Sequence, residues 1–207
     1  MNNANPVVSR PAFADAADVH DGGIWRASLA LALVTLIGFG FAYALAGTWV
    51  AGALFPTQAE GSLLREGGRV LGSRLVAQPF NDARYFQPRP SAAKYDPMSA
   101  AGSNQARSNP DLIQRIEETR AAVAARDGVD PVAVPSELLT QSGSGLDPDL
   151  SPAAAAQQVR RVARARGLDE QRVAALLRQH LQPRQYGVFG APRVNVLALN
   201  LALDDLR

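Results

Sequence analysis

The hydrophobic pattern of the chain is dominated by one long segment without charge. No charged side chain occurs between Arg26 and Glu60, and Ala27 to Phe55 is rich in Leu, Ala, Val, Ile, Phe and Gly. About 20 such residues are enough to cross the hydrocarbon core of a bilayer. The pattern therefore predicts a single transmembrane anchor helix over residues 24–55, preceded by a flexible tail at 1–23 and followed by a soluble domain at 56–207.

A cleaved signal peptide is the alternative for the same segment. Ala44-Leu45-Ala46 fits a small-x-small cleavage site after an apolar stretch. The apolar run nevertheless continues through Trp49 to Phe55, longer than a normal signal core, and an indole near the far end suits a membrane interface. The pattern favours a retained anchor. Arginines lie on both sides of the segment, so charge bias alone does not decide its orientation.

Capping residues predict three helices in the soluble part, over residues 109–128, 151–167 and 169–181. Each begins at an Asn, Ser or Asp that can accept a hydrogen bond from the first turn, and Pro follows in the first two. A Gly stands at the end of the first two, where a left-handed cap is common. Apolar residues recur at helical spacing in the first and third.

Strands are predicted at two places between and after these helices. Residues 69–76 form a short apolar run interrupted by Gly72, and residues 192–203 alternate for several positions, which is typical of a long strand partly buried on both faces. Residues 81–108 are rich in Pro, Ser and Asn and are predicted to form a loop. Helices and strands mix without regular alternation. The predicted fold class is therefore α+β, with one N-terminal transmembrane helix followed by a single mixed α/β domain.

Composition and isolated polar residues exclude several chemistries. The formal net charge is +2 with both signs interspersed, which gives no basic face for nucleic acid, and the chain has no cysteine for thiol chemistry. No phosphate-binding P-loop occurs. His20 and His180 are isolated, and Asp147 and Asp149 around a Pro are typical of a turn. No catalytic residue, no metal site and no tightly bound cofactor are predicted.

Four motifs in the soluble part and the anchor together resemble a known family. The motifs are Tyr-Phe-Gln-Pro-Arg-Pro-Ser-Ala at 85–92 with Ala-Gly-Ser-Asn at 101–104, Leu-Thr-Gln-Ser-Gly-Ser-Gly-Leu-Asp-Pro-Asp-Leu-Ser at 139–151, Gln-Val at 158–159 with Arg-Val-Ala-Arg-Ala-Arg-Gly-Leu at 161–168, and Pro-Arg-Val-Asn-Val-Leu at 192–197. In this order they resemble the C subunit of the Kdp-type potassium-transporting ATPase over about residues 24–204. The tail before the anchor is longer than expected for that family, and Ser99 to Ser103 replaces a tighter Ser-Gly-Gly-Ser.

The resemblance implies that the chain is a subunit of a complex and is not an enzyme by itself. The complex would take up potassium with high affinity at the expense of ATP, through a channel-like potassium-binding subunit, a P-type ATPase subunit and a small helical subunit. The chain would be single-pass in the cytoplasmic (inner) membrane, with membrane lipid around its anchor, its N-terminus cytoplasmic and its domain extracytoplasmic. The chain has no Asp-Lys-Thr-Gly phosphorylation motif, which agrees with hydrolysis in another subunit.

The resemblance implies one role for the segment that contains Ser142, Gly143, Ser144 and Gly145, and the residues themselves leave an alternative. As a catalytic chaperone, the chain would raise the ATP affinity of the ATPase subunit, with these residues and Gln158 as candidate nucleotide contacts, because successive amides can bind an anion. ATP would then bind only through the complex. The alternative is that the segment is a tight structural turn leading into the next helix.

A second set of residues predicts a partner interface. Tyr85, Phe86, Arg89 and Tyr95 lie on a Pro-stiffened loop, and Tyr and Arg often anchor interfaces. The chain would then serve assembly and stabilisation of the complex. The alternative is that the aromatic rings belong to the core and Arg89 pairs with a local carboxylate. A third hypothesis, independent of the resemblance, is a membrane-anchored extracytoplasmic binding or stalk protein without a transport role.

Overall fold

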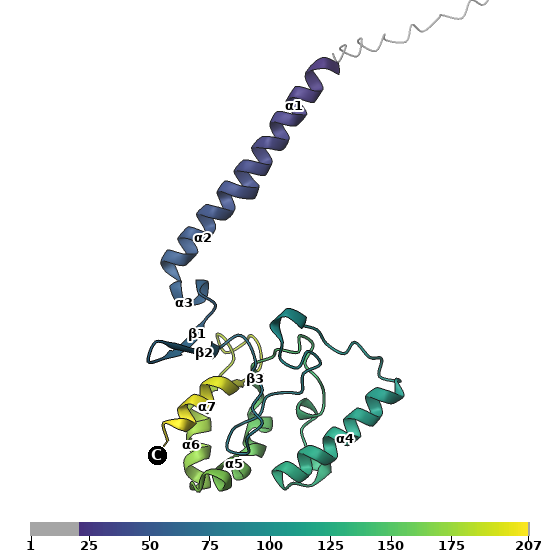
Figure 1. Cartoon of the computed structure of the whole chain (residues 1–207), viewed down its shortest axis with the longest axis vertical. Helices are drawn as coiled ribbons and strands as arrows, with labels where there is room; N and C mark the ends of the chain where they lie inside the picture. The colour runs from purple at the N-terminus through teal and green to yellow at the C-terminus, as the bar shows by residue number, and fades with distance from the viewer. Residues whose placement is uncertain (1–20, 207) are drawn as a thin grey trace, which may run out of the picture. The chain divides into compact units, whose positions relative to one another are not determined.

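The computed structural model describes residues 21–206, and the chain divides into two units after Ala59. Within the first unit, α1 (Asp21–Val34), a π-helical stretch (Thr35–Ala42) and α2 (Tyr43–Leu54) form one continuous helix, which α3 (Pro56–Ala59) follows (Figure 1). Most of the tail predicted at 1–23 lies outside the described residues.

The first unit contains a helix that is long and apolar enough to cross a membrane. This helix spans the 32 residues Gly23–Leu54, about 48 Å at the usual rise per residue, and its side chains are exposed. The hydroxyls of Thr35 and Thr48 donate to the carbonyl oxygens of Leu31 and Ala44, at 2.9 and 2.8 Å, so these polar groups are satisfied within the helix. Gly23–Leu54 is therefore the candidate membrane span of this chain, and the anchor predicted from the sequence has its counterpart here.

The second unit begins with a small antiparallel hairpin. It consists of β1 (Leu63–Glu66) and β2 (Arg69–Ser73), with a register irregularity between Leu64 and Arg65. Gly67 and Gly68 form the turn, both with positive φ (54° and 82°), which glycine adopts without strain. The sequence predicts β2 within 69–76 and misses β1, which is too short for a clear apolar pattern.

Three longer helices follow, as the capping residues predict. They are α4 (Pro110–Asp127), α5 (Pro152–Arg166) and α6 (Glu170–Gln179). Their N-caps are Asn109, Ser151 and Asp169, each of which accepts a hydrogen bond from an amide of the first turn. Gly128 and Gly167 end α4 and α5 in the left-handed conformation, with φ of 66° and 65°. The intervening loops carry three short 3-10 helices at Pro97–Ser99, Pro131–Ala133 and Ser136–Leu138.

A second sheet and a last helix complete the domain. Strands β3 (Asp149–Leu150), β4 (Leu181–Gln182) and β5 (Arg193–Asn195) form an antiparallel sheet in the order β3-β5-β4. Helix α7 (Val196–Asp204) follows β5 directly. The described domain is thus a mixture of helices and short strands, which confirms the mixed α/β fold.

The strand predicted over 192–203 is wrong beyond Asn195. The side chain of Asn195 accepts a hydrogen bond from the amide of Ala198 at 3.0 Å and so caps a helix. Leu and Ala, which fill the rest of the run, are strong helix formers, and the residues buried from Val196 to Leu203 repeat with helical spacing. A run that is apolar at nearly every position fits both periods.

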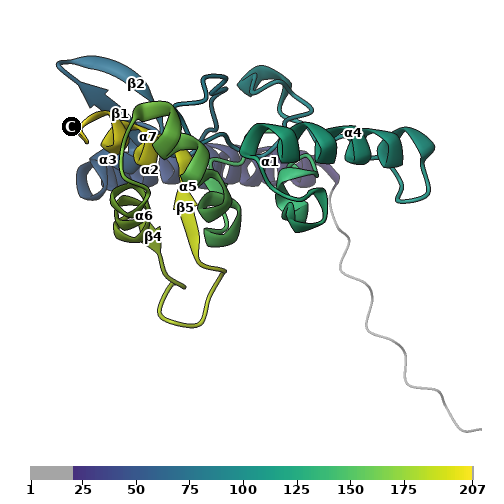
Figure 2. The same cartoon turned by 90° about the horizontal axis from the view of Figure 1, so that it is seen from below.

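The hydrophobic core lies around α5, which packs against both α4 and α6, while α6 also contacts α7 (Figures 1 and 2). The largest fully buried apolar side chains are Phe86, Leu150, Leu199 and Leu203. Because Phe86 comes from the Pro-rich loop, that loop crosses the core. What holds it there defines the candidate site.

Candidate functional site

An irregular segment, Ala83–Gln87, is held in the domain by side chains and forms no strand ladder. All five of its carbonyl oxygens accept hydrogen bonds from side chains of α5 or α7. The donors are Arg161 for Ala83 and Tyr85, Arg166 for Arg84, Asn200 for Phe86 and Gln158 for Gln87. We call Ala83–Gln87 the braced segment.

Two buried amide side chains clamp consecutive peptide groups of the braced segment. Asn200 accepts from the Phe86 amide at 2.8 Å and donates to the Phe86 carbonyl at 2.9 Å. Gln158 does the same with Gln87, at 2.9 and 3.0 Å. The two amide side chains are 1% and 0% exposed, so they take the place that a neighbouring strand would have. An unpaired buried backbone group costs about 1–3 kcal/mol, so each clamp matters for stability.

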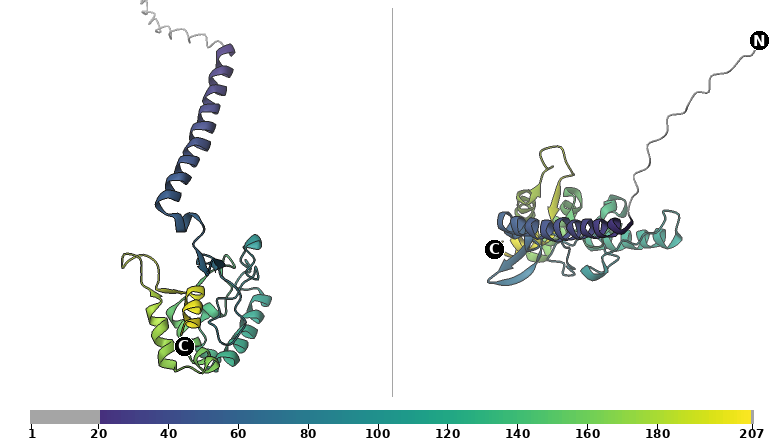
Figure 3. Two further views of the ribbon diagram at one scale, coloured as in Figure 1. Left: turned by 60° about the vertical axis from the view of Figure 1, so that its left-hand side comes forward. Right: turned by 90° about the horizontal axis from the view of Figure 1, so that it is seen from above.

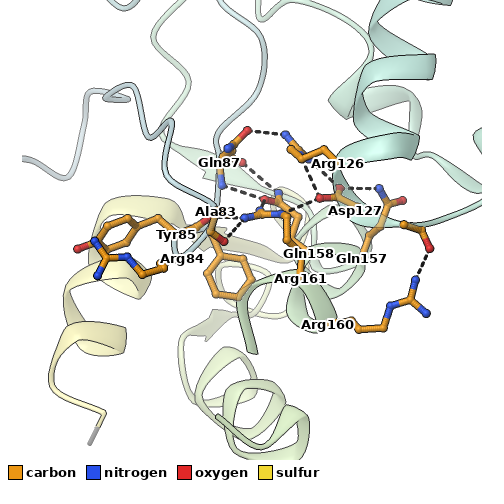
Figure 4. Close-up of polar contacts among 12 residues, drawn as sticks. Ala83, Arg84, Tyr85, Gln87, Arg126, Asp127, Gln157, Gln158, Arg160 and Arg161 are labelled. Atoms are coloured by element: carbon orange, nitrogen blue, oxygen red, sulfur yellow. Dashed lines mark hydrogen bonds and ion pairs between the residues drawn. The ribbon is translucent and has the colours of Figure 1, made fainter. Parts of the chain in front are cut away.

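A buried ion-pair cluster supports these clamps (Figure 4). The carboxylate of Asp127, whose side chain is 0% exposed, accepts from Arg126 at 2.7 and 2.8 Å and from Arg161 at 2.8 Å. Gln157 donates to the same carboxylate at 3.0 Å. Arg161 also donates to the Gln158 side-chain oxygen at 2.6 Å. The cluster therefore joins the end of α4 to α5 and, through Gln158, to the braced segment.

The charges of this cluster stabilise each other. Burial alone raises the pKa of Asp127, but hydrogen bonds and ion pairing with Arg126, together with those from Gln157 and Arg161, outweigh it and leave the pKa below its usual value. Burial lowers the pKa of Arg161, and the Asp127 carboxylate counteracts that effect. Arginine keeps its proton in proteins. At neutral pH the cluster is therefore fully ionised.

The loop beyond the braced segment packs against the Ser-Gly turn, residues 142–145. The Ser142 amide donates to the Pro90 carbonyl at 3.1 Å, and the Ser91 hydroxyl donates to the Gly145 carbonyl at 2.6 Å. Arg89 pairs with Asp147 at 3.0 Å. The structure thus brings together two of the motifs that carry the family resemblance, those at 85–92 and 139–151.

Most of the residues predicted as nucleotide contacts form hydrogen bonds within the chain, whereas the buried Ser142 hydroxyl has no partner. The amides of Ser142 and Gly145 donate to the carbonyls of Pro90 and Ser142, and the amide of Leu146 donates to the Ser144 hydroxyl. Ser142 is 2% exposed. Gln158 is bonded to the braced segment, as described above. Hydrogen bonds of this kind are typical of a tight structural turn.

The four residues predicted as a partner interface differ in burial. Phe86 is 0% exposed in the core, and Arg89 pairs with a carboxylate of its own domain, as the alternative reading has it. Tyr85 and Tyr95 are half-buried. The Tyr85 ring lies 5.5 Å from that of Phe80. The Tyr95 hydroxyl donates to the Arg89 carbonyl at 2.9 Å, and burial raises its pKa.

Sequence reasoning misses the residues that hold the braced segment in place, chiefly Asp127, Arg161 and Asn200. Asn200 leaves a signal, because it is the one polar residue in the apolar run Val196–Leu203. A buried polar side chain in such a run needs a partner. Asp127 leaves none, because a charged residue at the end of a helix is ordinarily exposed.

The Ser-Gly turn offers a test of its structural role with a matched control. A methyl group on Gly145, at φ 73°, would lie 2.8 Å from both the Ala101 carbonyl and the Ala93 side chain, whereas one on Gly143 meets nothing within 4 Å. Crowding and the left-handed backbone predict that Gly145→Ala lowers the free energy of unfolding by about 2–4 kcal/mol. Gly143→Ala should leave it within about 0.5 kcal/mol. Urea unfolding of both variants measures the difference, and equal losses would contradict the tight packing of this turn.

Residues 21–206 thus comprise one candidate membrane span and an α+β domain in which buried polar side chains hold a loop. The family model for KdpC, the c chain of the K+-transporting ATPase, matches residues 25–205. The chain is 67% identical over 186 residues to the potassium-transporting ATPase KdpC subunit of Xanthomonas campestris pv. campestris (strain B100), covering 90% of this chain and 89% of that relative.

More distant relatives carry the same name. The KdpC subunits of Shewanella putrefaciens and Kineococcus radiotolerans are 50% and 51% identical over 181 and 180 residues. These alignments cover 87% and 86% of this chain, and 89% and 91% of the two relatives. The chain therefore belongs to the KdpC family, a subunit of the K+-transporting ATPase, and the resemblance seen in its motifs is confirmed.

Proposed function

We propose that this chain is a non-hydrolytic accessory subunit of a high-affinity, ATP-driven potassium uptake complex. It assembles with and stabilises a channel-like potassium-binding subunit and a P-type ATPase subunit, accompanied by a small helical subunit. Its helix lies in the cytoplasmic membrane, its N-terminus in the cytoplasm and its domain on the extracytoplasmic side. Family membership supports the complex, and the candidate span supports the anchor.

The observation that carries this function is the use of the buried polar groups. Asp127, Arg161 and Gln158 are the kinds of residue that could serve chemistry. Arg161 and Gln158 bond the braced segment directly, and Asp127 holds Arg161 in place. A loop fixed in this way is preorganised, which reduces the entropy cost of binding a partner. The domain is thus built to present a rigid surface.

Co-purification of the intact chain from detergent tests this function. We expect a tagged chain to bring with it a large channel-like protein and a P-type ATPase, in a complex that hydrolyses ATP. The isolated chain should show no hydrolysis. Recovery of the chain alone, from membranes that contain the channel-like and ATPase subunits, would contradict the proposal and favour the stalk protein.

A second candidate function, contact with ATP, has one observation in its favour. A cavity of about 240 Å³ at the Asp127 ion-pair cluster is lined by four arginines and one buried carboxylate. The arginines are Arg126, Arg160, Arg161 and Arg164. Such a surplus of positive charge suits a phosphate group. Hydrogen exchange of the intact complex with and without ATP tests it: protection of residues 140–164 would support nucleotide contact, and unchanged exchange there would remove its support.

A further inference from the structure

The connection between β4 and β5 projects from the domain and carries exposed apolar side chains at its end. Figures 2 and 3 show this connection as a loop standing away from the helices. Tyr186 is 86% exposed, Val188 69% and Phe189 65%. We call residues 184–190 the hairpin tip. Large apolar side chains gathered so closely and left so exposed usually mark a contact surface.

The hairpin tip holds a defined shape through its own backbone. Gln185 and Phe189 exchange two hydrogen bonds of 2.9 Å between amide and carbonyl, and the Gly187 amide donates to the Arg184 carbonyl at 3.1 Å. Tyr186 has a φ of 53°, a left-handed conformation that is unfavourable for a residue with a side chain. The tip is therefore already in one conformation before any partner binds.

The chain around the hairpin tip is basic. From Gln171 to Leu203 the sequence has no Asp or Glu, and it has four arginines. Arg184 lies in the tip itself and is exposed. Arg193 follows in β5, where it pairs with Asp149 at 3.0 Å. Tyr and Arg are the residues most often found at the energetic centres of protein interfaces. A complementary surface would offer an apolar pocket with carboxylates at its rim.

We propose that the hairpin tip is a docking element that inserts into an apolar, acid-rimmed pocket of another subunit of the K+-transporting ATPase. The proposal rests on the proposed function, because family membership makes other subunits the available partners. A lipid surface accepts an apolar side chain in almost any geometry, so binding to lipid does not require a fixed turn. The internally bonded tip with its left-handed Tyr186 is shaped for a protein pocket.

The experiment uses the full chain, co-purified from detergent. The triple variant Tyr186→Ser, Val188→Ser, Phe189→Ser should reduce recovery of the other subunits at least tenfold, since a few centrally placed anchors supply most of the binding energy of an interface. Arg184→Glu should reduce recovery as well. The matched control, Met98→Ser with Val132→Ser, changes side chains that are 92% and 87% exposed elsewhere, and should not alter recovery. Thermal unfolding of each chain should stay unchanged, because all these side chains are exposed.

The outcomes separate the docking site from the function it rests on. If the unaltered chain recovers no partner, the proposed function fails. If it recovers partners and the triple variant does so equally well, the docking site alone is overturned. Equal recovery in detergent with weakened transport in liposomes would assign the tip to the bilayer. A dimer of the chain that the triple variant converts to a monomer would assign it to self-association. Either result overturns the proposal.

Discussion

Replacing Asp127 by Ala is expected to lower the free energy of unfolding of the domain by about 3–5 kcal/mol, because it leaves a buried arginine without its counter-charge. The side chain of Arg161 is only 6% exposed and would keep its charge among buried groups. Arg126 would lose two hydrogen bonds at the same time. Urea unfolding of the intact chain in detergent measures this loss of free energy, with tryptic cleavage within the braced segment as the readout.

The surface ion pair between Asp82 and Arg84 provides the matched control. It has the same chemistry and a similar distance, 2.9 Å, but the side chains are 45% and 58% exposed. Exposed pairs contribute little to stability. Asp82→Ala should therefore unfold at the same urea concentration as the unaltered chain, and an equal effect of the two substitutions would refute the role of burial.

The same carboxylate makes the effect of Asp127→Ala depend on pH. Its pKa in the folded domain lies below the usual value of about 3.9, so its stabilising contribution is complete above that value and is lost as the pH falls through the lower, folded pKa. The difference in stability between Asp127→Ala and the unaltered chain should consequently be constant near neutral pH and shrink in acid. A difference that grows in acid would contradict the direction of this pKa shift.

Gln158→Leu is the second change with a large expected effect, and it separates a structural from a nucleotide-binding role. Leu fills a similar volume but leaves the amide and carbonyl of the half-buried Gln87 without their partner. At about 1–3 kcal/mol for each such group, the free energy of unfolding should fall by about 2–5 kcal/mol. The effect is expected in the absence of any nucleotide, and is measured by urea unfolding.

The control for Gln158→Leu is Gln179→Leu, at the exposed end of α6. It makes the same chemical change where water can satisfy whatever is lost, and should alter stability by no more than about 0.5 kcal/mol. If Gln158→Leu left stability unchanged and weakened only ATP binding to the complex, the residue would be a ligand contact, and the clamp on Gln87 would be dispensable.

Features encoded by neighbouring residues are the ones that the sequence predicts well. The helices α4, α5 and α6 begin at Asn109, Ser151 and Asp169, and each cap bonds an amide two or three positions along the chain. The local sequence therefore contains both partners of the bond. The apolar anchor is equally local, because its length and composition suffice to recognise it.

The contacts that hold the braced segment cannot be predicted from local sequence, because their partners are far apart in the chain. Asn200 meets Phe86 across 114 positions, and Arg161 meets Asp127 across 34. Nothing near Asp127 reveals that an arginine from another helix will cover it. The run after Asn195 fails for a different reason, since its Leu and Ala are compatible with a strand until a helix cap and core contacts decide. Motif resemblance locates the right segments, but not the bonds between them.

The braced segment also sets the order in which the domain can be completed. Its carbonyl groups are paired only once the donor side chains of α5 and α7 are present. These helices are synthesised about 70 to 114 positions later in the chain. A chain emerging gradually during synthesis would therefore carry this stretch unpaired, and open to proteases, until residues near 200 had been added. Contacts of such long sequence separation slow folding. Maturation of the domain should accordingly be a late, single event after synthesis of α7, and not a stepwise build-up from its N-terminal side.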